Sequence, residues 1–331
     1  MAKKLSIVST LYMSQDYIHD FCKRCKDTAQ SIVGNNYEII LVNDGSPDKS
    51  LDVALEATSY CDNLTVLNLS RNFGHHAAMM AGLSKASGDL VFLIDSDLEE
   101  APEWLSAFLH EWNQTNADVV YGVQSNRKGN LLEKISGAIF WFFFIRLSGI
   151  NMPANQTTAR LMSRQYVDAL LLYKERELFL GAVWHLAGFT QLPLKVNKLS
   201  ISISTYTFRK KAKIFLESLT SFSNRPLYYI FYLGFALTTV STFGIVYLLI
   251  RWLFSDSGTP PGWISVLVSI WLLGGITIAF LGLIGIYIAK IYMETKQRPS
   301  TIIKEIYSST KQISTNTAGI SSTPRASDCI K

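Results

Sequence analysis

The stretch that decides the fold is Leu90-Val91-Phe92-Leu93-Ile94-Asp95-Ser96-Asp97. Its five consecutive apolar residues predict a strand that is buried on both faces of a parallel sheet. In open α/β sheets, ligands bind beyond the carboxyl ends of such strands. Two carboxylates at that edge are costly unless a cation or strong hydrogen bonds neutralise them. Because Mg²⁺ is usually held by one or two carboxylates and substrate phosphates, we interpret Asp95 and Asp97 as the holder of a metal–diphosphate ligand. The alternative is an acidic turn with solvated side chains.

The residues around this stretch alternate between predicted strands and helices. Strand patterns occupy residues 5–11, 37–42, 64–69 and 118–122, and helical patterns occupy residues 15–32, 51–59, 75–86 and a segment opened by Pro102. This alternation is typical of a doubly wound, mostly parallel sheet with helices on both faces. We therefore expect an α/β fold over residues 1–208.

The composition indicates a soluble front and a membrane-embedded back. The chain has 331 residues, of which 48% are hydrophobic, and a net charge of +5; the apolar excess collects after Tyr228. The four cysteines form no disulfide or zinc framework, so Cys22 and Cys25 of the lone CxxC are expected to be small apolar residues in a reducing compartment. No signal-peptide pattern follows Met1. We expect the front half in the cytoplasm and no nucleic-acid partner.

Two apolar runs predict a membrane hairpin. Residues 228–250 and 263–288 contain no charge, and each exceeds the roughly 20 residues that a helix needs to cross a bilayer. Basic residues crowd the outer flanks, so the positive-inside rule places the α/β domain and the C-terminus in the cytoplasm. We expect a multi-pass protein of the inner (cytoplasmic) membrane; the alternative is a buried hairpin in a soluble protein. Small residues such as Gly274, Gly275 and Gly282 leave a homo-oligomer open.

These patterns divide the chain into four parts. Residues 1–208 are the α/β domain, 209–227 an amphipathic juxtamembrane segment, 228–291 two transmembrane helices, and 292–331 a cytoplasmic tail that we expect to be disordered after about residue 308, where Ser, Thr, Asn, Gly and Ala predominate.

Three predicted strands end in polar residues at the same edge of the sheet. Thr10 and Tyr12 follow the first strand, Asp44 the second, and Asp95 and Asp97 the fourth. A nucleotide laid across this edge would meet them in turn: Asp44 could accept from a base N–H, Tyr12 could flank the base, and Asp97 could hold the metal on the diphosphate. A dinucleotide fold is disfavoured because no GxGxxG follows any strand.

Several motifs occur in a distinctive order. They are Val42-Asn43-Asp44-Gly45-Ser46-Pro47-Asp48, Ser70-Arg71-Asn72-Phe73-Gly74, Asp95-Ser96-Asp97-Leu98, Arg160-Leu161-Met162-Ser163-Arg164, and the stretch from Gly282 to Pro299 after the second apolar run. In these motifs the chain resembles the family-2 glycosyltransferases of GT-A fold. More narrowly, it resembles the polyprenyl-phosphate glycosyltransferases, the group of dolichol-phosphate mannose synthase and the bactoprenol glucosyltransferases. The resemblance covers nearly everything from Leu5 to Ile306.

The resemblance implies inverting transfer of a sugar from a nucleotide sugar, expected to be UDP-linked, to a membrane polyprenyl (undecaprenyl) phosphate. The product would be a lipid-linked sugar for cell-surface glycan modification, such as that of lipopolysaccharide O-antigen. The other functions that we weigh are transfer to another lipid-linked or glycan acceptor, and a non-catalytic membrane protein that retains a sugar-nucleotide fold.

The resemblance also implies roles for individual residues. Thr10, Tyr12, Asp44 and Ser96 would bind the nucleotide; Asp95, Asp97 and Glu99 would organise Mg²⁺ or Mn²⁺; and Asp95, Asp97 and Arg160 would form the catalytic set. The candidates for the acceptor phosphate are Arg127, Lys128, Lys134, Ser136 and Arg209. For Arg160 a structural ion pair is an equal alternative. Glu100 is expected to be a surface acid, and His75 and His76 to lie in a solvated first helical turn or near the diphosphate.

The chain departs from the family pattern at three positions. The acid that commonly follows the first strand is replaced within Tyr12-Met13-Ser14, the family's Asp before Ala159-Arg160-Leu161 is Thr158, and an Arg after the Tyr-Gly strand is Gln124. A phosphate acceptor is already an anion and needs no strong base, so the loss at Thr158 is compatible with transfer to phosphate.

Overall fold

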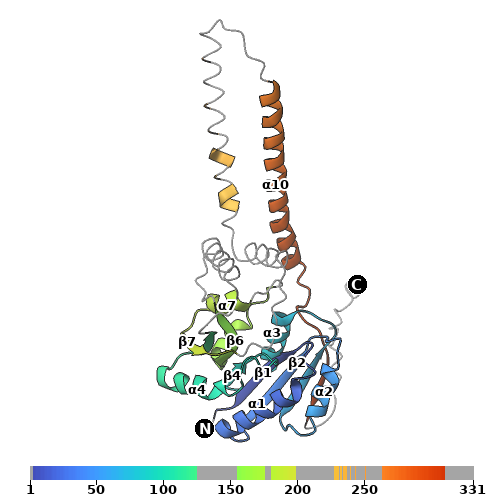
Figure 1. Cartoon of the computed structure of the whole chain (residues 1–331), viewed down its shortest axis with the longest axis vertical. Coiled ribbons are helices and arrows are strands. Elements are labelled where there is room, and N and C mark those ends of the chain that lie inside the picture. Colours follow the sequence, from blue (N-terminus) through green and yellow to red (C-terminus); the bar gives the residue numbers. More distant parts are fainter. Residues whose placement is uncertain are drawn as a thin grey trace, which may run out of the picture.

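A computed structural model describes residues 3–124, 155–175, 180–198 and 263–309, together with a few helical positions between 227 and 250. In this part of the chain the strands form one eight-stranded sheet in the order β7-β5-β6-β4-β1-β2-β3-β8 (Figure 1). The strands are β1 (Leu5–Leu11), β2 (Tyr37–Asn43), β3 (Leu64–Leu69), β4 (Leu90–Leu93), β5 (Val119–Gln124), β6 (Gln156–Ser163), β7 (Gln191–Val196) and β8 (Ile303–Ser308).

The centre of the sheet is parallel, as the apolar strand patterns predicted. β1 lies between β2 and β4 and is parallel to both, and β2 is parallel to β3. β6 is antiparallel to β4 and to β5, and β8 is antiparallel to β3. All four residues of β4 are buried, because helices cover both faces of a doubly wound sheet. The predicted α/β fold is confirmed, with β6 and β8 as antiparallel members.

Two apolar cores lie on opposite faces of the sheet. Phe21, Phe92 and Phe108 belong to the first core, under α1 (Ile18–Val33), α2 (Ser50–Ala57) and α4 (Trp104–Thr115). Met79 and Tyr166 belong to the second core, under α3 (His75–Lys85), α6 (Arg164–Leu170) and α7 (Leu180–Leu186). The helices thus form the two outer layers of a three-layer domain (Figure 1).

The predicted role of the cysteines is confirmed for those that the structure describes. Cys22, Cys25 and Cys61 are free and fully buried in the first core. Burial raises the pKa of the Cys22 thiol to about 12. These thiols therefore act as small apolar side chains, because only a thiolate is reactive.

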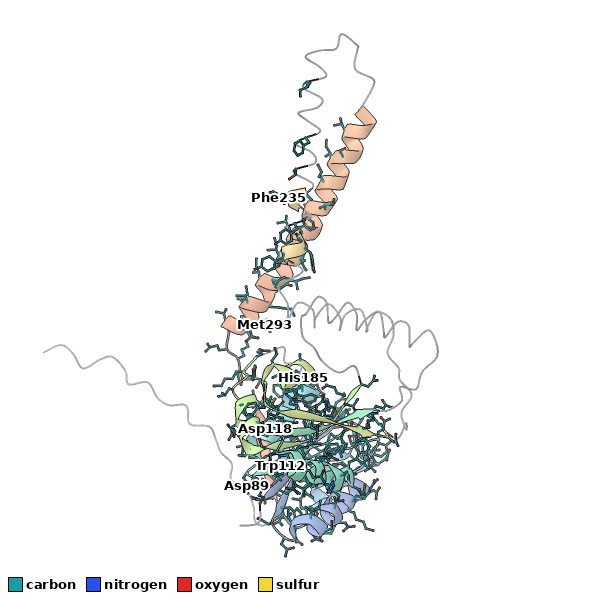
Figure 2. The ribbon with its side chains drawn as sticks, turned by 90° about the vertical axis from the view of Figure 1, so that its left-hand side faces the viewer. Asp89, Trp112, Asp118, His185, Phe235 and Met293 are labelled. Atoms are coloured by element: carbon teal, nitrogen blue, oxygen red, sulfur yellow. The ribbon has the colours of Figure 1, made fainter. Side chains whose placement is uncertain are left out.

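The parallel strands β1 to β4 begin at the end of the domain that is remote from the helix α10 (Trp263–Thr295). Figure 2 places Asp89, immediately before β4, at that remote end, and Met293 at the foot of α10, on the far side of His185. Since β1, β2 and β3 run parallel to β4, their carboxyl ends share one edge of the sheet. The polar residues after these strands are gathered at that edge.

The helix α10 is the one described helix long and apolar enough to cross a membrane, over Leu273–Thr295. A shorter apolar helix covers Leu227–Ala236. Most of the predicted first span, 228–250, lies outside the described residues, as does the juxtamembrane segment 209–227. In the part of the chain described by the structure, one helix therefore meets the length and hydropathy of a span.

The chain does not end at α10 as a free tail. After a short connector it returns to the domain as β8, whose Ile306 faces Leu67 and whose Tyr307 faces Val66 of β3. The Ser70 N–H donates to the Ile302 carbonyl at 2.9 Å, and the Asn68 amide donates to Glu305 at 3.1 Å. The predicted tail at 292–331 thus contains an edge strand, and residues 310–331 lie outside the description.

Candidate active site

Asp44 fixes the loop that leads into α3. Its Oδ1 accepts from the Phe73 N–H at 2.7 Å, and its Oδ2 accepts from the Gly74 N–H at 3.0 Å. The side chain is almost completely buried, and burial raises the pKa of the Asp44 carboxyl although both backbone hydrogen bonds act to lower it. Gly45 has a φ of +58°, and a Cβ there would lie 2.5 Å from the Arg71 carbonyl carbon. Asp44 therefore holds the loop, and its predicted contact with the nucleoside stays a prediction.

Asp44→Ala is expected to lower the free energy of unfolding by about 2–4 kcal/mol, because two hydrogen bonds to a charged acceptor are lost. Chemical denaturation measures this change. Asp44→Asn keeps one acceptor oxygen and should lose less, whereas Asp52→Ala on the exposed side of α2 should stay within about 0.5 kcal/mol of the wild type. An Asp44→Ala protein as stable as Asp52→Ala would show that the clamp does not hold the loop.

The carboxyl ends of β1 and β4 are linked by His75, the first residue of α3. Its Nδ1 lies 3.0 Å from Thr10 Oγ1 and its Nε2 lies 3.3 Å from Asp95 Oδ1. Burial favours the neutral imidazole, but the hydrogen bond and charge of Asp95 outweigh it and raise the pKa of His75. Burial likewise opposes ionisation of Asp95, yet His75 keeps the pKa of that carboxyl below its ordinary value. The protonated imidazole and the ionised carboxylate therefore stabilise each other.

Ser96, which follows β4, contacts the end of β1 through its hydroxyl. Its hydroxyl lies 2.9 Å from the Thr10 carbonyl and 3.2 Å from Ser14 Oγ, and the side chain is buried. The Ser96 hydroxyl is thus engaged inside the protein, and its predicted contact with the nucleotide stays a prediction. Tyr12, by contrast, is 52% exposed at the end of β1 and is free to flank a ligand.

Three acids and one lysine lie beside Asp95. Asp97 is half-buried and its Oδ1 accepts from the Glu99 N–H at 3.0 Å. Burial and the neighbouring Asp95 raise the pKa of Asp97. Lys198 Nζ lies 3.2 Å from Glu99 and 3.6 Å from Glu100, so one cation serves several carboxylates.

Glu100 is not the surface acid that we expected. It is fully buried, and it accepts from the Thr158 N–H at 3.1 Å and from the Ala159 N–H at 2.7 Å. Burial and the charge of Asp95 raise the pKa of Glu100 to about 7. It therefore braces the start of β6 against the turn that carries Asp95 and Asp97. The local sequence around Glu100 did not predict this role.

These donors fit a divalent cation only if a ligand completes its shell. Among the described residues, no three His, Cys, Asp or Glu side chains are grouped as a metal site. Apart from its ion pair with His75, the buried Asp95 Oδ1 has no hydrogen-bond partner in the described chain, and Asp97 offers further carboxylate oxygen. Of the three predicted ligands, Glu99 is paired with Lys198. Such a set suits Mg²⁺ or Mn²⁺ held jointly with phosphate oxygens.

Arg160 is enclosed by aromatic side chains. Its guanidinium is completely buried, lies over the ring of Trp184, and donates to the Thr157 and Thr158 carbonyls at 3.3 Å each. Burial lowers the pKa of Arg160 to about 9. No carboxylate of the described chain forms a salt bridge with it. The alternative of a structural ion pair is therefore not found among the described residues, and the catalytic role of Arg160 stays a prediction.

Arg160→Met tests that proposal. Replacing a buried charge by an apolar chain of similar length is often neutral, so we expect the free energy of unfolding to change by less than about 2 kcal/mol. Thermal or urea unfolding checks this, beside Arg160→Ala, which leaves a cavity and should cost more. If Arg160→Met keeps its stability but loses sugar transfer, Arg160 acts on the substrate rather than on the fold.

Comparison with known proteins follows the same residues. The model of the family described as Glycosyl transferase family 2 matches residues 6–171, which contain β1–β6 and the acid cluster. The chain belongs to glycosyl transferase family 2. A Mycobacterium tuberculosis (strain CDC 1551 / Oshkosh) protein named as a glycosyltransferase is 46% identical over 92% of this chain and 89% of its own length. The bactoprenol glucosyl transferase of Shigella phage SfV is 34% identical over 91% of this chain and 98% of its own.

The solved structure of S. aureus TarS 1-349 in complex with UDP is 16% identical, with a TM-score of 0.42 over 66% of this chain and 64% of its own. The family match and the curated relatives make this family-2 transferase an enzyme with a GT-A-like α/β fold. The resemblance read from the ordered motifs is thus confirmed at the level of the family.

The structure adds three residues to the predicted site of the family-2 transferase. They are His75, which contacts Asp95, Glu100, whose pKa the charge of Asp95 raises, and Lys198, which contacts Glu99 and Glu100. His75 had a local signal, a histidine directly after the glycine of Arg71-Asn72-Phe73-Gly74, whereas Lys198 had none. The predicted acceptor residues Arg127, Lys128, Lys134, Ser136 and Arg209 lie outside the described residues.

Proposed function

We propose that this glycosyltransferase transfers a sugar from a nucleotide sugar to a polyprenyl phosphate at the cytoplasmic face of the inner membrane. The proposed donor is a UDP-sugar. The observation that carries the proposal is that β8, the strand that follows the apolar helix α10, belongs to the same sheet as the strands that carry the carboxylates. The name of the phage relative, bactoprenol glucosyl transferase, supports the same acceptor class.

The donor site is formed at the carboxyl edge of β1 and β4. Asp97, together with Asp95, would hold Mg²⁺ or Mn²⁺ with the diphosphate, and Tyr12 and Thr10 lie where the nucleoside would enter. When bound, the cation supplies neutralisation of the charge that develops on the leaving diphosphate. The chain's own contribution is to hold Asp95 through His75 and to brace the turn through Glu100 and Lys198.

The position of β8 supports a membrane hairpin. β8 follows α10 along the chain but pairs with β3, so residues before and after the apolar region share one sheet. A chain that crossed a bilayer once would leave these strands on opposite sides. If Leu273–Thr295 crosses, the chain must cross an even number of times. An even number of crossings keeps the domain and β8 on the same side of the membrane, and the basic flanks of the apolar runs make the cytoplasm the proposed side.

The acceptor phosphate makes the absence of a carboxylate at position 158 tolerable. A phosphate monoester oxygen is already anionic, so its attack on the sugar needs positioning more than a general base. Thr158 acts to lower the pKa of the Asp95 carboxyl and so belongs to the donor side. We propose that basic residues near the membrane, with Arg127 and Arg209 as the first candidates, orient the acceptor phosphate.

Incubation of the detergent-extracted full chain with labelled UDP-sugars, Mn²⁺ and undecaprenyl phosphate tests the proposal. Label in the lipid fraction, lost with EDTA and restored by Mn²⁺, is the expected result. Label in a different lipid or glycan would change the acceptor, and nucleotide binding without any transfer would favour a non-catalytic membrane protein. GDP-sugars in parallel decide the nucleoside.

A further inference from the structure

We propose that His75 is a positioning residue of the donor site: its imidazole ties Thr10 at the end of β1 to Asp95 after β4 and so fixes the carboxylate that meets the cation–diphosphate ligand. The inference rests on the proposed function for the identity of that ligand. It assigns a role to a side chain for which the sequence left a solvated helix turn as the alternative.

The geometry of His75 uses both ring nitrogens. Nδ1 lies 3.0 Å from Thr10 Oγ1, and Nε2 lies 3.3 Å from Asp95 Oδ1. A neutral imidazole with its proton on Nε2 accepts from the Thr10 hydroxyl and presents its N–H 3.3 Å from the Asp95 carboxylate, and a protonated imidazole keeps both contacts. The bridge therefore needs no change of protonation state.

The two partners of His75 are largely buried, whereas the His75 side chain itself is partly exposed. Thr10 is 7% exposed, and the Asp95 side chain is 19% exposed, but the His75 side chain is 49% exposed. A histidine that served only core packing would be buried, and a histidine in a merely solvated turn would not contact two strand ends. His75 does neither: both of its ring nitrogens are engaged, and its exposed face is available to a ligand.

The backbone that presents His75 is itself held. Gly74, which precedes the helix, has a φ of +97°, a value that favours glycine, and its N–H donates to Asp44. The Asp44 clamp and the β1 end therefore fix the start of α3 relative to the end of β4. His75 would thus act as an outer-shell partner, which orients a metal-binding carboxylate without binding the metal itself.

His76 provides a matched control in the next position. Its ring lies 5.9 Å from the His75 ring, so the two substitutions alter the same turn and remove the same chemical group. Of this turn, it is His75 that contacts both Asp95 and Thr10. A difference between His75→Ala and His76→Ala therefore reports the bridge and not the general loss of a histidine.

Calorimetric titration of the full chain in detergent with UDP, and separately with GDP, tests the bridge in the presence of Mn²⁺ and in EDTA. His75→Ala should weaken the Mn²⁺-dependent affinity for the nucleotide roughly tenfold or more, as outer-shell substitutions do. His75→Gln, whose amide can still donate to Asp95, should recover most of that loss. His76→Ala should bind as the wild type, and in EDTA all four proteins should bind alike.

Three results would overturn the inference. They are wild-type Mn²⁺-dependent binding by His75→Ala, an equal loss in EDTA, and a His75→Gln protein as weak as His75→Ala. If His75→Ala does not fold, Thr10→Val removes the other end of the bridge and should show a smaller loss of the same Mn²⁺-dependent kind. Unchanged binding by a folded Thr10→Val protein would then count against the bridge.

A double-mutant cycle shows whether His75 acts through Asp95. In an Asp95→Asn background, His75→Ala should cause little further loss of affinity, because the carboxylate that it orients is gone. Additive losses would assign His75 an independent contact. If the wild type binds neither UDP nor GDP, the proposed function fails; if it binds and His75→Ala matches it, only the present inference fails.

Discussion

Asp97→Ala is expected to reduce sugar transfer by at least roughly a hundredfold, the scale of removing one preorganised charge-stabilising group from an active site. Asp97 lies half-buried at the carboxyl edge of the sheet, four residues beyond the end of β4. Loss of its carboxylate would leave Asp95, which is engaged by His75, as the nearest remaining ligand. Initial rates of label transfer at saturating Mn²⁺ measure the effect.

The same substitution should change the stability of the fold little. Burial and the adjacent charge of Asp95 raise the pKa of Asp97, so the ionised form is disfavoured in the folded protein. Relief of this cost offsets the lost hydrogen bond from the Glu99 N–H, and the unfolding temperature should stay nearly unchanged. Asp62→Ala, at a side chain that is 86% exposed, is the matched control and should keep full activity. Wild-type transfer by Asp97→Ala would remove Asp97 from the mechanism.

A chain that ends after Ile302 is expected to be about 3 kcal/mol less stable than the full chain. It lacks β8, and Ile303, Ile306 and Tyr307 are partly buried against the two cores. Full burial of such a side chain contributes about 1.5–3 kcal/mol, so three half-buried ones account for the estimate. The exposed edge of β3 should also promote association between chains.

A chain that ends after Ser309 is the control, because it keeps all of β8 and the hydrogen bond from the Ser309 N–H to the Leu64 carbonyl. It should unfold like the full protein and transfer sugar at the same rate. Chemical denaturation and size-exclusion chromatography compare the three proteins. Equal stability of the chains ending at 302 and at 309 would show that β8 is dispensable for the domain.

The local sequence predicted the centre of the fold because the information is local there. Apolar runs such as 90–93 form strands wherever helices cover both faces, and the residues that follow them necessarily lie at the ligand-binding edge. The strands β1, β2, β3 and β5 and the helix α3 begin within a few residues of the predicted bounds. The family match confirms the resemblance that the ordered motifs indicated.

The remaining features depend on contacts that no local pattern encodes. β8 is a short strand of mixed polarity, and its Glu305 meets Asn68 across 237 residues of sequence. Glu100 looks like a surface acid beside Glu99 until two backbone N–H groups of β6 are found to donate to it. Lys198 lies two residues after β7 and nearly 100 residues after the acids that it contacts. Tertiary contacts, rather than periodicity, determined each of these.

The late position of β8 along the chain sets an order on biosynthesis. A ribosome releases β1 to β7 first, then the apolar helix, and only then the residues that cover the edge of β3. Until translation ends, that edge has unpaired backbone groups, and nascent chains are prone to associate in this state. Completion of the enzyme's sheet therefore reports that the apolar segment has been made in full, and a prematurely terminated chain would leave an unfinished domain.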